Sequence, residues 1–157
     1  MRTQLYLIGK TDFAYLREGI ALYEKRLKNY LRYESKVIHN AKHPKSATPD
    51  QMREREGDAI LKQLDPGDYL VLLDERGKAM TSPQLADWVE QRRMAAPRRL
   101  VFVVGGAYGF SDAVYRRADA QLSLSKMTFS HQMIRLFFVE QLYRAMTILA
   151  GEPYHHQ

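Results

Sequence analysis

Residues 99–109 read Arg-Leu-Val-Phe-Val-Val-Gly-Gly-Ala-Tyr-Gly, an apolar run that ends directly in a glycine-rich turn. The run from Leu100 to Val104 predicts a buried strand. Glycines directly after such a strand let the backbone approach a ligand, and ligands bind at the carboxyl ends of parallel strands. The turn from Gly105 to Gly109 matches neither the G-x-G-x-x-G dinucleotide fingerprint nor a P-loop. A ligand loop and a tight strand-to-helix turn therefore both remain open.

Outward from this strand, apolar residues alternate between strand-like runs and helical periodicity. Further strands are expected at 5–8, 33–39, 69–74 and 121–125. Helices are expected at about 13–30, 49–64, from 82 onward, 111–120 and 132–150. Thr48 and Thr81 are predicted N-caps, and Gln84 completes a capping box with Thr81. This order predicts one α/β domain over residues 1–157, with helices covering a mainly parallel sheet.

A second candidate ligand loop follows the last expected strand and reads Ser125-Lys126-Met127-Thr128-Phe129-Ser130-His131. Small hydroxyls, a methionine and a phenylalanine form an unusual combination directly before a helix. A plain connector with Ser130 as the helix N-cap explains the same residues, and His131 then has no chemical role. The residues alone do not decide between these interpretations.

The last expected helix is apolar nearly all round, from Met133 to Leu149. A helix without a solvated face needs a second burial surface, so it is either a central core helix or part of a subunit interface. Glu140 and Arg144 stand four residues apart on this helix. They can pair across one turn or orient a substrate group, and the sequence does not choose.

The C-terminal tail, Glu152-Pro153-Tyr154-His155-His156-Gln157, differs from an ordinary frayed end. Pro153 stiffens it, and tyrosine and histidine are residues that stack on nucleobases and move protons. We expect no dedicated metal site at the two histidines.

Composition and charge exclude several classes of protein and favour others. The chain has no cysteine, which excludes disulfides and thiolate metal sites. No apolar run reaches the length of a membrane span and no secretion signal is recognisable, so we expect a cytoplasmic protein with no membrane partner. The net charge of +6 favours a polyanion such as nucleic acid, although many small proteins are mildly basic. No serine nucleophile elbow, metal-binding H-E-x-x-H helix or kinase motif set occurs.

A resemblance to a known family rests on five segments in chain order. They are Leu-Leu-Asp-Glu-Arg-Gly-Lys at 72–78, Val-Gly-Gly-Ala-Tyr-Gly at 104–109, Leu-Ser-Leu-Ser-Lys-Met-Thr at 122–128, Glu-Gln-Leu-Tyr-Arg-Ala at 140–145 and Pro-Tyr-His at 153–155. Together they resemble the RlmH family of bacterial 23S ribosomal RNA pseudouridine N3-methyltransferases, within the SPOUT superfamily. Family members often have Pro-Glu-Gly where this chain has Ala107-Tyr108-Gly109, and proline where Ser130 stands.

The resemblance implies a SPOUT α/β fold with a deep C-terminal trefoil knot, and a homodimer. It also implies S-adenosylmethionine bound in a bent form within the knot. Leu73 would end a strand beside this cofactor, and Gly105 and Gly106 would lie under it. The remaining implied cofactor residues wrap its adenine and methionine groups largely through backbone atoms: Leu124, Ser125, Lys126, Met127, Thr128 and Phe129.

The implied substrate is a pseudouridine in helix 69 of 23S ribosomal RNA, on the assembled ribosome. We expect Arg144 to hold the target base or its phosphate. Tyr154 and His155 would position the base, with His155 as a candidate proton acceptor. The expected electrostatic footprint for RNA consists of Arg17, Lys25, Arg26, Lys42, Lys45, Arg116 and Arg117. A knotted methyltransferase for another ribosomal or transfer RNA nucleotide and a non-enzymatic ribosome-assembly factor remain as alternatives.

Overall fold

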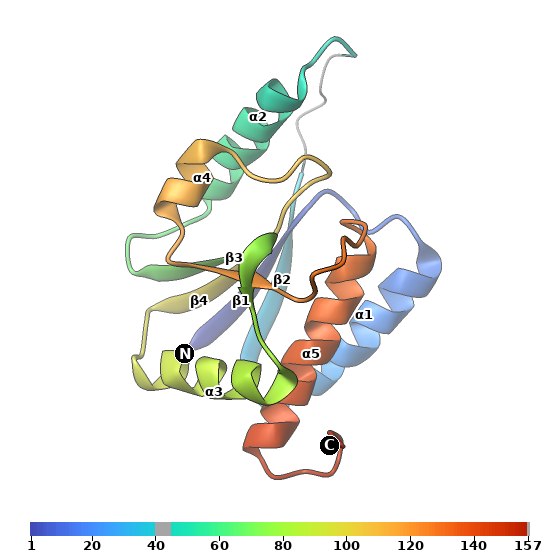
Figure 1. The fold of residues 1–157 in the computed structure, drawn as a ribbon, viewed down its shortest axis with the longest axis vertical. Helices are drawn as coiled ribbons and strands as arrows, with labels where there is room; N and C mark the ends of the chain where they lie inside the picture. The colour runs from blue at the N-terminus through green and yellow to red at the C-terminus, as the bar shows by residue number, and fades with distance from the viewer. Residues whose placement is uncertain (40–44, 157) are drawn as a thin grey trace.

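A computed structural model describes residues 1–39 and 45–156, and its centre is a five-stranded sheet (Figure 1). The strands are β1 (Arg2–Ile8), β2 (Arg32–Ile38), β3 (Asp68–Ala79), β4 (Arg99–Val104) and β5 (Ala120–Ser123). They lie in the order β2-β1-β4-β3-β5, and every neighbouring pair is parallel. The predicted α/β class with a mainly parallel sheet is confirmed. That residues 1–157 form a single domain stays a prediction.

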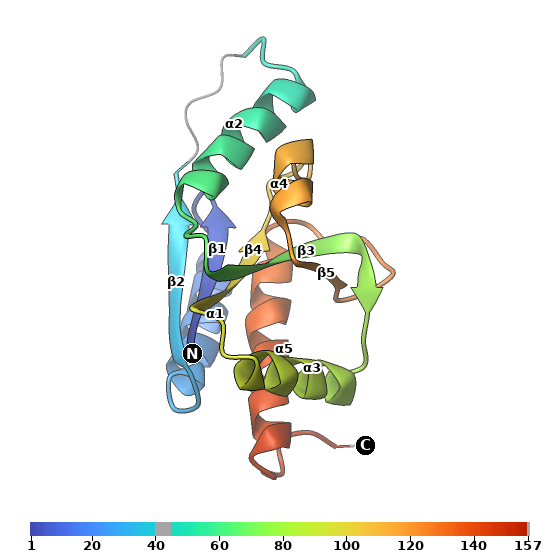
Figure 2. The same cartoon turned by 90° about the vertical axis from the view of Figure 1, so that its left-hand side faces the viewer.

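Five helices cover the sheet in the described part of the chain. They are α1 (Ala14–Leu27), α2 (Pro49–Lys62), α3 (Ser82–Met94), α4 (Asp112–Arg117) and α5 (Met133–Leu149). Helices α1, α3 and α5 share one apolar core with the sheet, and α2 and α4 share a second one. In the ribbon, α2 and α4 accordingly lie together, away from the other three helices (Figures 1 and 2).

Strand β4 shows why its sequence reads as an unbroken apolar run. Leu100, Phe102 and Val104 face the core under α1, α3 and α5, whereas Val101 and Val103 face the core under α2 and α4. All five side chains are buried. Because successive side chains of a strand point to opposite faces, a strand buried on both faces has no polar positions.

Strand β3 is longer than the sequence predicted, because it continues past Asp74 to Ala79. Its pairing with β5 shifts register on the way, and the polar extension runs past β5 (Figure 2). A Cβ atom on Gly77 would lie 2.7 Å from backbone atoms of Gln121 and Leu122. The two backbones therefore cross in close contact. The expected end at Asp74 was wrong because the extension is polar and lacks the apolar pattern that marks a buried strand.

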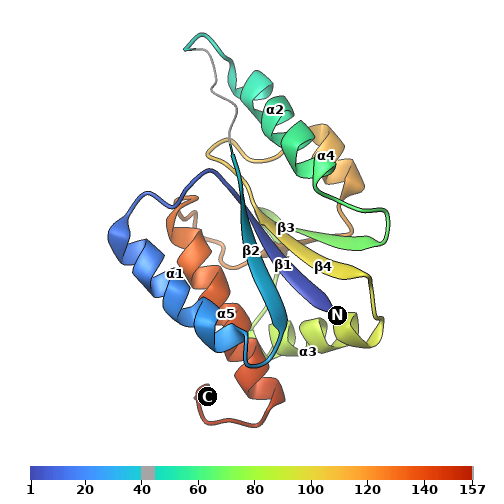
Figure 3. The ribbon, with the colours of Figure 1, turned by 180° about the vertical axis from the view of Figure 1, so that it is seen from behind.

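The last helix, α5, lies between α1 and α3, and both pack along it (Figure 3). Phe138, Val139 and Leu142 are fully buried, so most of the helix belongs to the core. Its outer side is less covered, and Phe137 is 37% exposed there. The helix ends as expected before Gly151, whose φ of 70° is a conformation that favours glycine.

Helix α5 also buries an arginine that its apolar pattern did not reveal. Arg135 is 0% exposed and has no ion-pair partner among the described residues. Its guanidinium donates hydrogen bonds to the carbonyl oxygens of Ile8 at 2.7 Å, Gly9 at 2.9 Å and His131 at 3.2 Å, and to the Thr11 hydroxyl at 3.0 Å. Arg135 thus ties the carboxyl end of β1 to the start of α5.

The predicted helix starts are confirmed at α2 and α3. The Thr48 hydroxyl accepts a hydrogen bond from the backbone N–H of Gln51 at 3.2 Å, and the Thr81 hydroxyl accepts one from Gln84 at 3.3 Å. Each glutamine side chain accepts a bond from the N-cap backbone in return. Within residues 1–39 and 45–156, no helix has the length and apolar character needed to cross a membrane.

Candidate functional site

A cleft of about 730 Å³ opens at the carboxyl ends of β3, β4 and β5. The turn after β4 forms one part of its wall, and the loop after β5 forms another. Leu73 and the residues that follow it in β3 line a third part, and Ile134 near the start of α5 completes the lining. The volume is in the range of small-molecule sites, and the position at strand carboxyl ends is where α/β sheets bind ligands.

The cleft gathers the residues expected to hold a cofactor. Both sequence-predicted loops contribute to it, with the lining residues Leu73, Gly105, Gly106, Leu124, Ser125, Met127, Thr128 and Phe129. Lys126 is the exception, because its side chain is exposed and does not line the cleft. The structure therefore brings two loops that lie about 20 residues apart in sequence to one cavity.

Close packing explains the glycines of the first loop. The backbone N–H of Gly109 donates to the carbonyl oxygen of Gly106 at 3.2 Å, and Gly109 has a φ of 81°. A Cβ on Gly105 would lie 3.0 Å from the ring of Phe110. The segment is therefore a tight turn that also forms a wall of the cleft, and its role as a ligand loop stays a prediction.

A carboxylate lies behind this turn. A Cβ on Gly106 would come within 2.5 Å and 2.6 Å of the two carboxylate oxygens of Glu56 on α2. Glu56 is 9% exposed, and no described residue forms a hydrogen bond or ion pair with its carboxylate. Burial raises the pKa of Glu56 above its ordinary value. Glu56 could not be predicted from the sequence, because α2 is rich in charged residues and nothing marks this one as buried.

Polar contacts hold the wall formed by β3 at Asp74 and the residues that follow it. The Tyr115 hydroxyl donates to the Asp74 carboxylate, and Arg76 donates to the Tyr115 oxygen at 2.9 Å. Burial and the bond to Asp74 raise the pKa of Tyr115, so its phenol stays protonated. Across the cleft, the Thr128 hydroxyl donates to the Glu75 carboxylate at 2.6 Å, which joins this wall to the loop after β5.

The second loop is shaped by its own hydroxyl groups. The Ser123 hydroxyl donates to the carbonyl of Ser125 at 2.7 Å, and the Ser125 hydroxyl accepts from the N–H of Met127 at 3.0 Å. Ser130 accepts from the N–H of Met133 at 3.0 Å and so satisfies a donor at the start of α5, although the N-cap position is Gln132 and not Ser130 as expected. His131 lines the cleft, and burial together with the nearby charge of Arg135 lowers its pKa. Its imidazole is therefore neutral at pH 7.

The three predicted catalytic residues also lie together, but at the other end of α5. The Arg144 guanidinium donates to Glu140 at 2.6 Å and lies 3.1 Å from His155 Nδ1. It also lies over the Tyr154 ring, 4.7 Å from its centroid. The Tyr154 hydroxyl donates to the same Glu140 oxygen at 2.8 Å. Glu140 thus organises the cluster, and of the two sequence alternatives the i,i+4 pair with Arg144 is present.

These contacts define the protonation of the cluster. A guanidinium has no lone pair, so it must donate to His155 Nδ1, and the proton of the neutral imidazole then lies on Nε2. Both His155 Nε2 and Arg144 Nε are buried without a hydrogen-bond partner among the described residues. Burial, with the neighbouring Tyr23 hydroxyl and Glu140, raises the pKa of Tyr154. The cluster therefore holds two buried N–H groups that have no acceptor among the described residues.

Cleft and cluster do not meet within one chain. None of Arg144, Tyr154 and His155 lines the cleft. Ile134 does line the cleft, and Arg144 lies ten positions after it on α5. At 1.5 Å per residue the two are about 15 Å apart along the helix.

The expected RNA footprint is not gathered on one surface either. Arg17, Lys25 and Arg26 lie on α1, and Arg116 and Arg117 lie on α4, across the sheet. Arg117 donates to the carbonyl of Asp68 at 2.9 Å and so supports the fold. Lys42 lies outside the described residues. In the described segments, no cluster of three or more histidines and carboxylates could hold a metal ion.

A family model described as "Predicted SPOUT methyltransferase" matches residues 1–155. The chain belongs to the SPOUT methyltransferase family. Three relatives named "Ribosomal RNA large subunit methyltransferase H" align with it over 157 residues, which is the full length of both chains in each case. They come from Parabacteroides distasonis at 57% identity, Bacteroides fragilis at 51% and Flavobacterium psychrophilum at 48%. The resemblance to the RlmH family and the assignment as an enzyme are thereby confirmed.

Proposed function

We propose that this SPOUT methyltransferase transfers the methyl group of S-adenosylmethionine to N3 of a pseudouridine in helix 69 of 23S ribosomal RNA. The reaction would take place on assembled ribosomes in the cytoplasm. The main support is the cleft, because it unites the two loops that the RlmH resemblance assigns to the cofactor. The names of the full-length relatives support ribosomal RNA as the substrate.

The residues of the cleft suit S-adenosylmethionine. Gly105 and Gly106 line the cleft with backbone in a tight turn, so a planar adenine can lie against backbone groups there. Leu73 and Leu124 supply apolar walls, and the serine and threonine hydroxyls of the second loop supply polar contacts. The bound cofactor supplies a methyl group that is already activated as a sulfonium. The protein then has mainly to align the target nitrogen for in-line attack.

We also propose the deep trefoil knot of the family. Its support is the close crossing of backbones at Gly77, where the extension of β3 passes over β5. Further support comes from α5, which is buried between α1 and α3 although it is the last helix of the chain. A chain that threads a loop departs from the usual rule that connections stay unknotted.

We propose a homodimer that completes the active site with residues of both subunits. The separation of about 15 Å along α5 means that one chain alone cannot bring Arg144 to its own cofactor. The outer side of α5 carries Ile134, Phe137, Gln141 and Arg144 at helical spacing, with Phe137 partly exposed. An antiparallel, two-fold pairing of α5 helices near residue 139 would bring Arg144 of one subunit beside Ile134 of the other.

At the target base, the cluster would act through hydrogen bonds and charge. Tyr154 has a raised pKa, so it would act as a neutral phenol rather than a base. His155 carries its proton on Nε2 while Arg144 occupies Nδ1, so it would donate to a carbonyl next to N3. The positive charge of Arg144 would stabilise the negative charge that develops as N3 loses its proton. This geometry favours His155 as a donor and not as the proton acceptor, so the N3 proton would pass to solvent.

Methyl transfer from labelled S-adenosylmethionine to intact ribosomes, compared with free 23S RNA, tests the function. Ribosomes from a strain that lacks the enzyme should accept the label at one pseudouridine, mapped by mass spectrometry, and free RNA should not. Arg144→Ala should abolish transfer while cofactor affinity stays within about twofold. Label at another nucleotide, or cofactor binding without any transfer, would overturn the proposal.

Mixed dimers test the composite site. Arg144→Ala keeps the cofactor loops, and a Gly105→Trp variant that fails to bind cofactor keeps the cluster. When both inactive variants are refolded together in equal amounts, half of the dimers are mixed and each mixed dimer has one intact composite site. Roughly a quarter of wild-type activity should therefore return. If no activity returns, the cleft and the cluster do not act across the dimer.

A further inference from the structure

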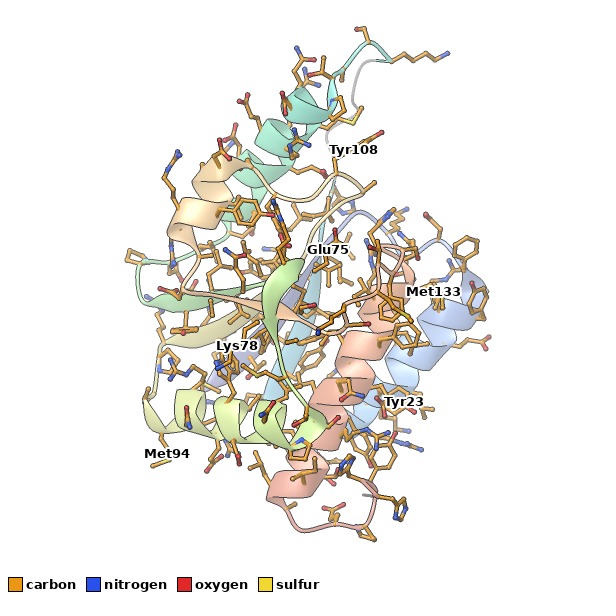
Figure 4. All side chains as sticks on the ribbon, viewed as in Figure 1. Tyr23, Glu75, Lys78, Met94, Tyr108 and Met133 are labelled. Carbon is orange, nitrogen blue, oxygen red and sulfur yellow. The ribbon has the colours of Figure 1, made fainter. Side chains whose placement is uncertain are left out.

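One aromatic side chain at the rim of the cleft has no role in the fold. Tyr108 lines the cleft and is 52% exposed. Its ring pairs with no other aromatic ring, and its hydroxyl has no hydrogen-bond partner, within the part of the chain that the structure describes. It belongs to neither apolar core. In the side-chain view Tyr108 lies at the tip of its loop, above Glu75 of the opposite wall (Figure 4).

The backbone that carries this ring is held firmly. Tyr108 stands at the third position of a turn closed by the bond from Gly109 N–H to the Gly106 carbonyl. Arg53 of α2 donates to the Tyr108 carbonyl oxygen at 3.3 Å, and Arg53 is itself paired with Asp50. A ring on a rigid turn loses little conformational entropy when a ligand covers it.

The surroundings of Tyr108 suit a nucleobase. Met127 and Phe129 also line the cleft and are exposed, so apolar side chains flank it on the loop after β5 as well. Arg53 contacts the backbone of the same residue and is paired with Asp50, and its side chain remains 29% exposed at this rim. An exposed aromatic ring at the edge of a cleft is the kind of surface on which single-stranded nucleic acids stack their bases.

We propose that Tyr108 is a stacking platform for a nucleobase of the ribosomal RNA, and that it positions the RNA for methyl transfer. The stacked base is a neighbour of the target nucleotide, which must itself enter the cleft to reach the methyl group. The tyrosine lies at the rim, where RNA enters, and half of its surface stays open. This inference rests on the proposed transfer to ribosomal RNA and adds the contact that positions this substrate.

Steady-state methyl transfer to intact ribosomes tests the proposal with Tyr108→Ala and Tyr108→Phe. Base–aromatic stacking contributes about 1–3 kcal/mol, so Tyr108→Ala should raise KM for ribosomes by roughly 5- to 150-fold. The affinity for S-adenosylmethionine, measured by calorimetry with the RNA absent, should change less than twofold. Tyr108→Phe keeps the ring and should restore a KM close to that of the wild type. Tyr15→Ala, which removes an exposed tyrosine of α1 outside the cleft, is the matched control.

The other possible outcomes of the Tyr108 experiments decide between the ring, its hydroxyl and the cofactor. An unchanged KM for Tyr108→Ala on ribosomes that the wild type methylates would overturn the stacking role and leave the proposed function intact. A parallel loss of cofactor affinity would assign the ring to the adenine of the cofactor and overturn the RNA contact. If Tyr108→Phe is as impaired as Tyr108→Ala, the hydroxyl and not the ring matters. A wild type inactive on ribosomes would overturn the proposed function and this inference with it.

Discussion

Replacement of Gly106 by alanine tests how the glycine turn is packed. The new Cβ would lie 2.5 Å and 2.6 Å from the Glu56 carboxylate oxygens, closer than unbonded carbon and oxygen atoms approach. The carboxylate must therefore move by roughly 0.5–1 Å, and Glu56 also lines a second cavity of about 460 Å³ that leaves it some room. Because the group ends a flexible side chain, the cost should be that of moderate overpacking, about 1–3 kcal/mol of the free energy of unfolding.

Chemical denaturation of four proteins measures this interaction: the wild type, Gly106→Ala, Glu56→Ala and the double variant. Glu56→Ala removes the group that the new methyl would strike, so the double variant should recover most of the 1–3 kcal/mol lost in Gly106→Ala. Calorimetry on the same proteins should give weaker cofactor binding for Gly106→Ala and recovery in the double variant, since Gly106 lines the cleft. If the two effects on unfolding add within about 0.5 kcal/mol, the turn does not rest against Glu56 and the reasoning is refuted.

Three further substitutions test the fold and its charges, each by denaturant unfolding. Arg135→Met should lower the free energy of unfolding by about 3–5 kcal/mol, because it leaves buried carbonyl groups such as that of Ile8 without a donor. A loss of less than about 1 kcal/mol would contradict the four hydrogen bonds of the Arg135 guanidinium. Gly77→Ala should lower the free energy of unfolding more than Gly106→Ala does. The new Cβ at position 77 would lie 2.7 Å from backbone atoms, which cannot rotate away as a side chain can. A smaller loss for Gly77→Ala than for Gly106→Ala would argue against the backbone crossing. Glu56→Gln should stabilise the protein at pH 7. The folded-state pKa of Glu56 is raised above 4.5, so its carboxyl contributes stability below about pH 4.5 that is lost as pH rises through the folded pKa. An advantage of the glutamine variant that grows in acid would contradict this sign.

Local chemistry explains why much of the fold follows from the sequence. A strand buried on both faces must be apolar throughout, as from Leu100 to Val104, and a helix start needs an acceptor for its first N–H groups, as at Thr48. Such features depend only on residues close in sequence. The expected end of β3 at Asp74 was wrong because the extension is held by its pairing with β5, which the local pattern of β3 does not record.

The site likewise contains residues that the sequence marks as candidates and residues that it does not. The glycine turn and the serine-rich loop could be predicted as candidates, and the structure brings them to one cleft. Tyr108 carried a signal, an aromatic residue in a turn between glycines after a buried strand. Glu56 carried none, because its burial depends on how α2 packs against the turn.

The sequence by itself determined the α/β class, the starts of α2 and α3, the family and the residues that could carry chemistry, whereas the helices expected at 13–30 and 111–120 end earlier, at Leu27 and Arg117. Each of these depends on periodicity, on capping groups or on ordered motifs along the chain. Only the tertiary structure decided that Gly105 and Thr128 line the same cleft while Arg144 and His155 lie at the far end of α5. The physical reason is that a helix of 17 residues separates its two ends by about 25 Å, whichever motifs it carries. The cleft and the Arg144 cluster lie apart in space although their motifs follow one another in the chain. This separation is the reason for proposing an active site that needs two subunits.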